Sequence, residues 1–97
     1  MQNNKLPLIE FANSFNKDLL AIPTEIKIAI RHTLKIFKEN PSNKSLRNHS
    51  LEILGKRCHG LFSIDVTSDY RAVYRHEKDK IIFIILDTHV RLYGKDK

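Results

Sequence analysis

The sequence lacks several features that define large classes of proteins. It has no apolar run of about eighteen residues, the length that a membrane-spanning helix needs, so we expect no membrane association. The segment MQNNKLPLIE has no positively charged start followed by an apolar stretch, so we expect no signal peptide. The single cysteine, Cys58, cannot form an internal disulfide, which fits a reducing compartment. Together these absences favour a cytoplasmic protein.

Motifs of familiar enzyme classes are absent as well. The sequence contains no P-loop, no glycine-rich dinucleotide fingerprint and no serine-nucleophile motif. Cys58 and His59 are adjacent, but no second pair follows at the spacing of a zinc site. We therefore expect no metal and no cofactor.

The charge of the chain is unbalanced. Seventeen Lys and Arg residues against eleven Asp and Glu residues give a net charge of +6 and a pI of about 9.6. The 97 residues are enough for one domain, over 1–97. A charge excess of this size in so small a domain favours a polyanionic partner, most often nucleic acid. The alternative is that the charge serves solubility alone.

The apolar pattern predicts an α+β fold with the order β-α-α-β-β-β. We expect an N-terminal strand and an α-helical hairpin packed on one face of a small antiparallel β-sheet, with the other face open. Asn13 or Ser14 is expected to cap the first helix and Thr24 the second. The expected elements are strands over 6–11, 61–67, 70–76 and 81–87 and helices over 11–22 and 23–40.

The segment SIDVTSDYRAVY (63–74) predicts a β-hairpin. A two-residue turn would place apolar and charged residues on the same side of the sheet, which is costly for a buried charge. A three-residue connection, 67–69, keeps the apolar residues together and places Asp65 opposite Arg71 on the open face. This register pairs Val66 with Tyr70, Ile64 with Ala72 and Phe62 with Tyr74. The Asp65–Arg71 pair is then either a surface salt bridge or an arginine held ready for phosphate.

The connection over 41–60 is polar and basic, and loops often carry function. We expect Leu46, Leu51, Ile53 and Leu54 to attach it to the core. Its basic and imidazole side chains are Lys44, Arg47, His49, Lys56, Arg57 and His59.

Three segments resemble the RelE/ParE toxin superfamily of bacterial toxin–antitoxin systems. They are NHSL (48–51), GLFSIDVTSDYRAVY (60–74) and DTHVRLYG (87–94), and within the superfamily they are most similar to the YafQ-like branch. The expected element order is also that of these toxins, so the resemblance covers nearly the whole chain. The hairpin together with the C-terminal segment is its most specific part.

The resemblance implies a ribosome-dependent endoribonuclease, an mRNA interferase that cuts mRNA in the A site and inhibits translation. Such toxins need no metal. The RNA 2′-OH attacks the adjacent phosphorus, the 5′-oxygen leaves, and the products are a 2′,3′-cyclic phosphate and a 5′-OH. The implied partners are mRNA on the ribosome, rRNA and a cognate antitoxin protein.

The resemblance also assigns site residues by position, namely His49, Asp69, Arg71, His89 and Tyr93. Some YafQ-like members have His where this chain has Asp65, which makes Asp65 a further candidate. If that His carries a proton, its work falls here to His49 or His89, or the reaction is slower.

The chemistry of these side chains agrees with the assignment. An imidazole with an ordinary pKa of about 6.5 can act as acid or base, and an aspartate can accept a proton or orient a histidine. An arginine can hold phosphate, and a tyrosine can stack on a base. Each residue also has an ordinary structural explanation: His89 can cap a strand, Asp69 can close a turn, and Tyr93 can pack. The cations expected to bind the RNA backbone are Lys44, Arg47, Lys56, Arg57, Arg91 and Lys95.

Two other functions remain open. A ParE-like module that inhibits DNA gyrase would share the fold without any chemistry of its own. The third possibility is a basic RNA-binding fold that has lost its activity. Asp65 points to it, because some YafQ-like members have His at this position. The group of polar site residues distinguishes the nuclease from the inhibitor, because an inhibitor needs no histidines, aspartate and arginine on one face.

Overall fold

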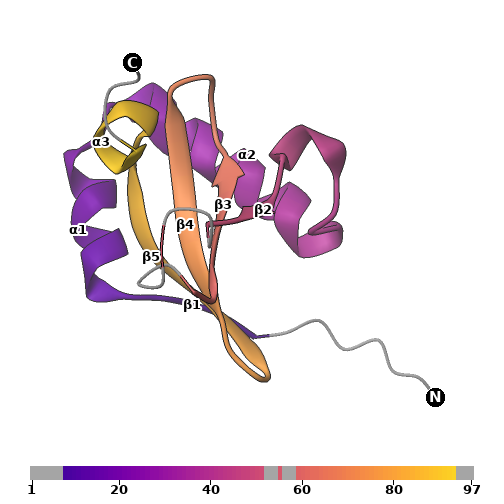
Figure 1. The fold of residues 1–97 in the computed structure, drawn as a ribbon. Helices are drawn as coiled ribbons and strands as arrows, with labels where there is room; N and C mark the ends of the chain where they lie inside the picture. Colours follow the sequence, from indigo (N-terminus) through magenta and orange to yellow (C-terminus); the bar gives the residue numbers. More distant parts are fainter. Residues whose placement is uncertain (1–7, 52–54, 56–58, 94–97) are drawn as a thin grey trace.

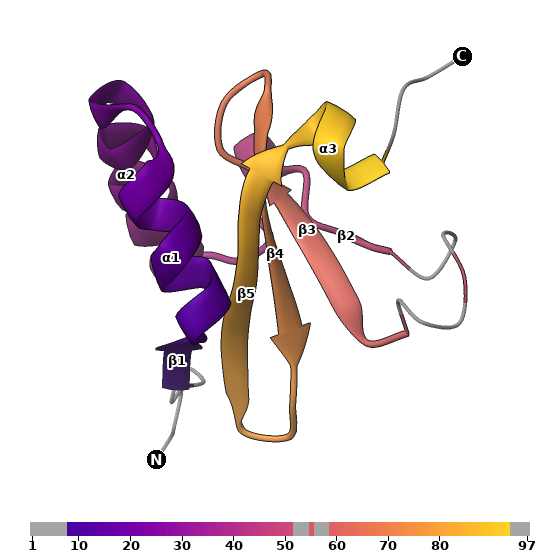
Figure 2. The same ribbon diagram turned by 90° about the vertical axis from the view of Figure 1, so that its left-hand side faces the viewer.

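The computed structural model describes residues 8–51, 55 and 59–93, which form a five-stranded sheet with helices on both sides (Figure 1). The helices α1 and α2 lie together on one side of the sheet, and the short α3 lies on the other (Figure 2). None of the helices in these residues is long and apolar enough to cross a membrane. In chain order the elements are β1 (Leu8–Phe11), α1 (Asn13–Ala21), α2 (Thr24–Glu39), the 3-10 helix η1 (Lys44–Leu46), β2 (His49–Ser50), β3 (Leu61–Asp65), β4 (Tyr70–His76), β5 (Lys80–Thr88) and α3 (His89–Tyr93).

The sheet has the strand order β1-β5-β4-β3-β2. The expected α+β class and the helical hairpin are confirmed, but the expectation of a purely antiparallel sheet is wrong. The strand β1 runs parallel to β5, with Leu8 opposite Lys80, and the other neighbours are antiparallel. A parallel pair needs a long connection, and the two helices and three strands between β1 and β5 provide one. The sheet is therefore mixed.

A fifth strand lies within the connection over 41–60, where we expected no strand. The two-residue β2 pairs with β3, and His49 lies opposite Ser63. Two residues are too few to show the alternation of polar and apolar side chains that predicts a strand. Leu46 and Leu51 are buried on either side of β2, as expected, whereas Ile53 and Leu54 lie outside the described residues.

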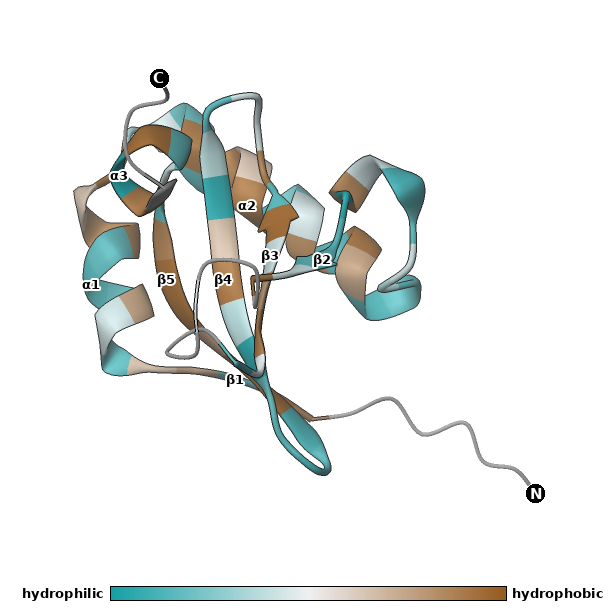
Figure 3. Cartoon of the chain, viewed as in Figure 1, coloured by the Kyte–Doolittle hydropathy of each residue, from teal (hydrophilic) through white to brown (hydrophobic). Residues whose placement is uncertain are grey.

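Aromatic side chains dominate the core between the helices and the sheet. The ring of Phe37 on α2 lies 5.2 Å from that of Tyr74 and 5.4 Å from that of Phe83. Ile30 and Thr33 are buried on the same face of α2 as Phe37, and this face packs against the sheet. The strand β5 is hydrophobic along most of its length, whereas the turn between β4 and β5 is hydrophilic (Figure 3).

The predicted helix caps are wrong. Ala12 and Pro23 occupy the N-cap positions, and neither donates or accepts a side-chain capping bond. The hydroxyl of Ser14 instead donates to the main-chain oxygen of Ile84 at 2.6 Å. Asp18 accepts from the main-chain N–H of Leu86 at 2.9 Å. Because β1 ends at residue 11, the edge of β5 beyond that point needs other partners, and α1 supplies them.

The face of the sheet opposite α1 and α2 is only partly open. Ser63 and Val73 lie on it, and both are fully buried, which corrects the expectation of an open face. Leu51, which donates its N–H to the main-chain oxygen of Leu61, is also buried there. The paired charges Asp65, Arg71 and Asp87 lie near the end of the sheet that carries the turn between β3 and β4. The candidate site is at that end.

Candidate active site

The hairpin of β3 and β4 has the register that the sequence predicts. Asp65 lies opposite Arg71, Ile64 opposite Ala72, and the chain turns over residues 67–69. The Nε atom of Arg71 lies 3.0 Å from Oδ1 of Asp65. The predicted ion pair is therefore confirmed, on the face opposite α1 and α2.

Arg71 is also tied to the turn of its own hairpin. Its Nη1 donates to the main-chain oxygens of Thr67 at 2.9 Å, Ser68 at 3.2 Å and Tyr70 at 3.1 Å. Only 13% of its side chain is exposed. These contacts fix the shape of the turn, and with it the position of Asp69. The arrangement favours a positioning role for Arg71, and its binding of phosphate stays a prediction.

Further charges extend the Asp65–Arg71 pair into a row across the sheet. Arg47 Nε lies 3.5 Å from Asp65 Oδ2. Asp87 lies opposite Arg71 on β5, and its Oδ2 accepts from Arg91 Nε at 3.1 Å. The row alternates in sign in the order Arg47, Asp65, Arg71, Asp87 and Arg91. The outer arginines are well exposed, so positive charge reaches solvent at both ends.

Asp69 and His89 meet at the end of the sheet. The main-chain N–H of His89, the first residue of α3, donates to the main-chain oxygen of Asp69 at 2.7 Å. Asp69 in turn is held by Thr67, whose hydroxyl oxygen accepts from the N–H groups of Asp69 and Tyr70. Both Asp69 and His89 are exposed. Two residues that the sequence places twenty positions apart are thus adjacent.

His49 lies near the other end of the charged row, next to Arg47. Its Nδ1 is 2.8 Å from the main-chain oxygen of Arg47. A carbonyl oxygen only accepts, so Nδ1 carries the proton and Nε2 of the neutral ring holds the lone pair. Arg47 itself has a φ of +48°, a left-handed conformation that an L-residue rarely adopts and that ends η1. His49 is exposed, and Nε2 is the atom of its ring suited to accept a proton.

The candidate residues therefore occupy one end of one face. The strands β2 and β5 are three strand spacings apart, or about 14 Å, with the charged row between them. His49 lies near one end of this row, and His89 follows β5 near the other end. A ligand that reached both imidazoles would run along the row.

Some predicted site residues cannot be placed. Lys56, Arg57 and Lys95 lie outside the described residues, and of Tyr93 only the main chain is described, at the end of α3. Lys44, in η1, is exposed and lies on the side of Arg47 and His49.

Asp87 and Thr67 are site residues that the sequence reasoning missed. The register between β4 and β5 shifts at Val73 and Tyr74, so alternation along the two strands does not show that Arg71 and Asp87 face each other. Thr67 offered a clearer signal, because a Thr two residues before Asp69 is suited to a side-chain turn.

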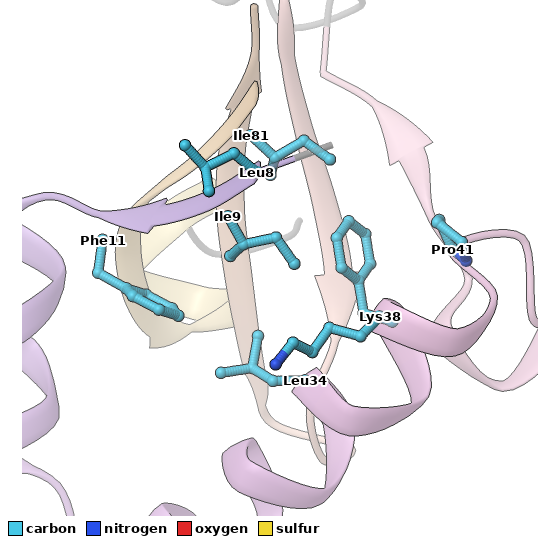
Figure 4. A pocket seen from close by; sticks show the side chains of 8 residues that line it. Leu8, Ile9, Phe11, Leu34, Lys38, Pro41 and Ile81 are labelled. Atoms are coloured by element: carbon cyan, nitrogen blue, oxygen red, sulfur yellow. The ribbon is translucent and has the colours of Figure 1, made fainter. Parts of the chain in front are cut away.

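An apolar groove lies elsewhere on the molecule. It has a volume of about 420 Å³ and lies between β1 and α2, where Leu8, Ile9 and Leu34 line it (Figure 4). Lys38 contributes the charge among its described lining residues. A groove of this composition offers no acid or base, so it is not a candidate for the chemistry.

Among known proteins, the chain matches solved structures. No family model matches the sequence, and no curated protein matches it either. Solved structures do match. One structure of the E. coli DinJ–YafQ toxin–antitoxin complex superimposes with a TM-score of 0.72 at 18% identity, covering 93% of this chain and 100% of that one. A second DinJ–YafQ structure gives 0.63 at 27% identity, covering 89% and 97%.

A structure from another organism provides a third match. The RelB–RelE antitoxin–toxin complex from Methanococcus jannaschii gives a TM-score of 0.67 at 25% identity and covers 87% of this chain and 94% of that one. The chain therefore has the fold of the RelE-superfamily toxins. Its structure is similar to those of YafQ and RelE, which agrees with the resemblance of its hairpin and C-terminal segments.

Proposed function

We propose that the chain is the toxin of a type II toxin–antitoxin system and a metal-independent, ribosome-dependent endoribonuclease. The observation that carries the proposal is the main-chain bond between His89 and Asp69. It supports a single site, because it joins the turn of the hairpin to the C-terminal segment that resembles the same toxins. The neighbouring folds belong to toxins crystallised with DinJ and RelB, which supports a cognate antitoxin as partner.

The proposed chemistry is an in-line attack of the RNA 2′-oxygen on the adjacent phosphorus. Nε2 of His49 takes the proton of the 2′-OH, the bond from 2′-oxygen to phosphorus forms, and the bond from phosphorus to the 5′-oxygen breaks. Protonated His89 gives its proton to the leaving oxygen. The contact of Nδ1 of His49 with the main-chain oxygen of Arg47 supports its role as base, because it leaves Nε2 as the ring atom that can accept a proton. The products are a 2′,3′-cyclic phosphate and a 5′-OH.

The charged row has two roles in this proposal. Arg71 fixes the turn that carries Asp69, and Asp65 holds Arg71. Asp69 then orients His89 or balances its positive charge. The exposed Arg47 and Arg91 attract the RNA backbone, and fixed positive charge stabilises the phosphorane. In this chain Asp65 pairs with Arg47 and Arg71. Any proton transfer that a histidine makes at this position in YafQ-like toxins is therefore made here by His49 or His89.

Expression in bacteria tests the proposal. We would compare wild type with His89→Ala, His49→Ala and the control His32→Ala, which removes an exposed histidine from α2. Wild type and His32→Ala should arrest growth and create in-frame cuts in mRNA. The His89 and His49 variants should lose the cuts by about 100-fold or more, as expected for an acid or base, while circular dichroism shows them folded.

Two results would contradict the nuclease. If wild type and His89→Ala both arrest growth without new RNA ends, the protein is a ParE-like inhibitor, and supercoiling by DNA gyrase becomes the next assay. If wild type neither arrests growth nor cuts RNA, the fold has lost its activity.

A further inference from the structure

A polar groove adjoins the candidate face at the edge of the sheet. It has a volume of about 460 Å³, within the range of roughly 300–1,000 Å³ that is usual for small-ligand sites. Phe62, Tyr74 and His76 line it, and these residues lie on the side of the sheet that faces α2. The groove is thus reached from the candidate face by passing around β2.

One wall of the groove is aromatic. The rings of Phe62 and Tyr74 are stacked, with centroids 5.4 Å apart and planes at 16°. The ring of His76 meets Phe62 edge-on at 6.4 Å. Tyr74 is buried, Phe62 is half-buried and His76 is exposed, so the accessible part of this wall belongs to Phe62 and His76. Flat aromatic surfaces of this kind accept a nucleobase irrespective of its identity.

The opposite wall is polar and basic. Asn48 holds it in place, because its Oδ1 accepts from the hydroxyl of Tyr74 at 3.0 Å and its Nδ2 donates to the main-chain oxygen of Pro41 at 3.1 Å. Lys44 and Arg47 supply positive charge, and no carboxylate is found among the described residues that line the groove. An anion is therefore favoured over a cation as ligand.

Arg47 and His49 connect the groove to the candidate active site. Both line the groove, while Arg47 also lies 3.5 Å from Asp65 of the charged row. A polymer that binds along the row can continue around β2 into the groove and stay close to positively charged side chains. This continuity favours a strand of nucleic acid over a separate small molecule.

We propose that this groove binds one nucleotide of single-stranded RNA next to the cleavage site. The base stacks on the exposed ring of His76, beside Phe62, and the phosphate lies against Lys44 and Arg47. The inference rests on the proposed function in taking RNA as the polymer. It adds a subsite that the catalytic residues do not require, and it assigns His76 a role in binding.

Binding to an RNA that cannot be cleaved tests the subsite apart from the chemistry. The probe is a fluorescent single-stranded oligonucleotide with 2′-O-methyl groups, which lacks the attacking hydroxyl. We expect His76→Ala to weaken its binding roughly five- to one-hundred-fold, the range of one stacked base. His32→Ala is the matched control and should bind as wild type does. Amide NMR shifts on adding the oligonucleotide should include residues 43–50 and 74–76.

Each outcome either supports or overturns the RNA subsite. Equal binding by wild type and His76→Ala, or NMR shifts confined to residues around Asp69 and His89, overturns the subsite even if the protein cleaves RNA. Groove shifts with polyglutamate but none with the oligonucleotide also overturn it and indicate an acidic protein segment instead. Weakened binding by His76→Ala in a protein that makes no cuts would keep the subsite and refute the nuclease.

Discussion

The guanidinium of Arg71 is surrounded by acceptors from its own hairpin. Nε contacts Asp65, and Nη1 contacts three main-chain oxygens of the turn. The sequence could predict the Asp65–Arg71 pair, because only one register keeps the apolar residues of both strands on one side. It could not predict the contacts with the turn, since these depend on the path of the main chain from Thr67 to Tyr70.

Replacing Arg71 tests this reading of the site. Arg71→Ala should lower the free energy of unfolding by about 2–3 kcal/mol, because it removes charge-assisted hydrogen bonds that are largely shielded from solvent. Arg91→Ala is the matched control. Its ion pair with Asp87 is exposed, so the loss should be about 0.5 kcal/mol or less. Urea unfolding measures both, and equal losses in the two variants would refute the structural role.

Tyr74 gives a pH-dependent prediction. Burial raises the pKa of its phenol above the ordinary value of 10.0, although the hydrogen bond with Asn48 acts in the opposite direction. The folded state thus prefers the protonated phenol. The stability that this preference contributes is complete below pH 10.0 and is lost as pH rises through the folded-state pKa.

Tyr74→Phe removes both the hydrogen bond and the titration. At pH 8 the variant should be less stable than wild type by about 1 kcal/mol, the usual worth of one hydrogen bond. Above pH 10.0 this difference should shrink, because only wild type has the buried phenol to ionise. Urea unfolding at a series of pH values measures the difference. A difference that stays constant or grows above that pH would contradict the account.

At the scale of elements, α1 completes the edge of β5. The helix supplies an acceptor and a donor, Asp18 and Ser14, beyond the point where β1 stops pairing. The sequence pattern predicted that this helix exists, because its apolar spacing is clear. It did not predict these bonds, since Ser14 near a helix start is more often a cap. The parallel direction of β1 was missed for a related reason, because a four-residue strand carries no information about its partner.

Asp18 is the more important of the two contacts. Asp18→Ala leaves the N–H of Leu86, a buried residue, without its acceptor and should lower the free energy of unfolding by about 1–3 kcal/mol. Asp18→Asn keeps an acceptor oxygen and should lose less. Lys17→Ala, an exposed neighbour on α1, serves as the control and should be nearly neutral. Thermal unfolding orders the three variants, and an Asp18→Ala protein as stable as the control would contradict the role of this helix.

At the scale of the whole molecule, the aromatic core and the charged row lie on opposite sides of the sheet. The aromatic core fills the side of α1 and α2, and the alternating row crosses the other side near α3. The charge excess of +6 was evident from composition, but its arrangement was not. Residues from η1, the hairpin turn and α3 come together only when the sheet forms. The C-terminal histidine therefore acquires its proposed function from the fold, since in sequence it is only one of five.

The chemistry of the RNA ends tests the central claim most directly. RNA from cells that express the wild-type protein would be examined for the terminal groups on both sides of each new cut. Attack by the 2′-oxygen predicts a 2′,3′-cyclic phosphate on one fragment and a 5′-OH on the other, and both should disappear with His89→Ala. Cuts that carry a 3′-OH and a 5′-phosphate, or that persist at full yield in the His89→Ala protein, would contradict the account.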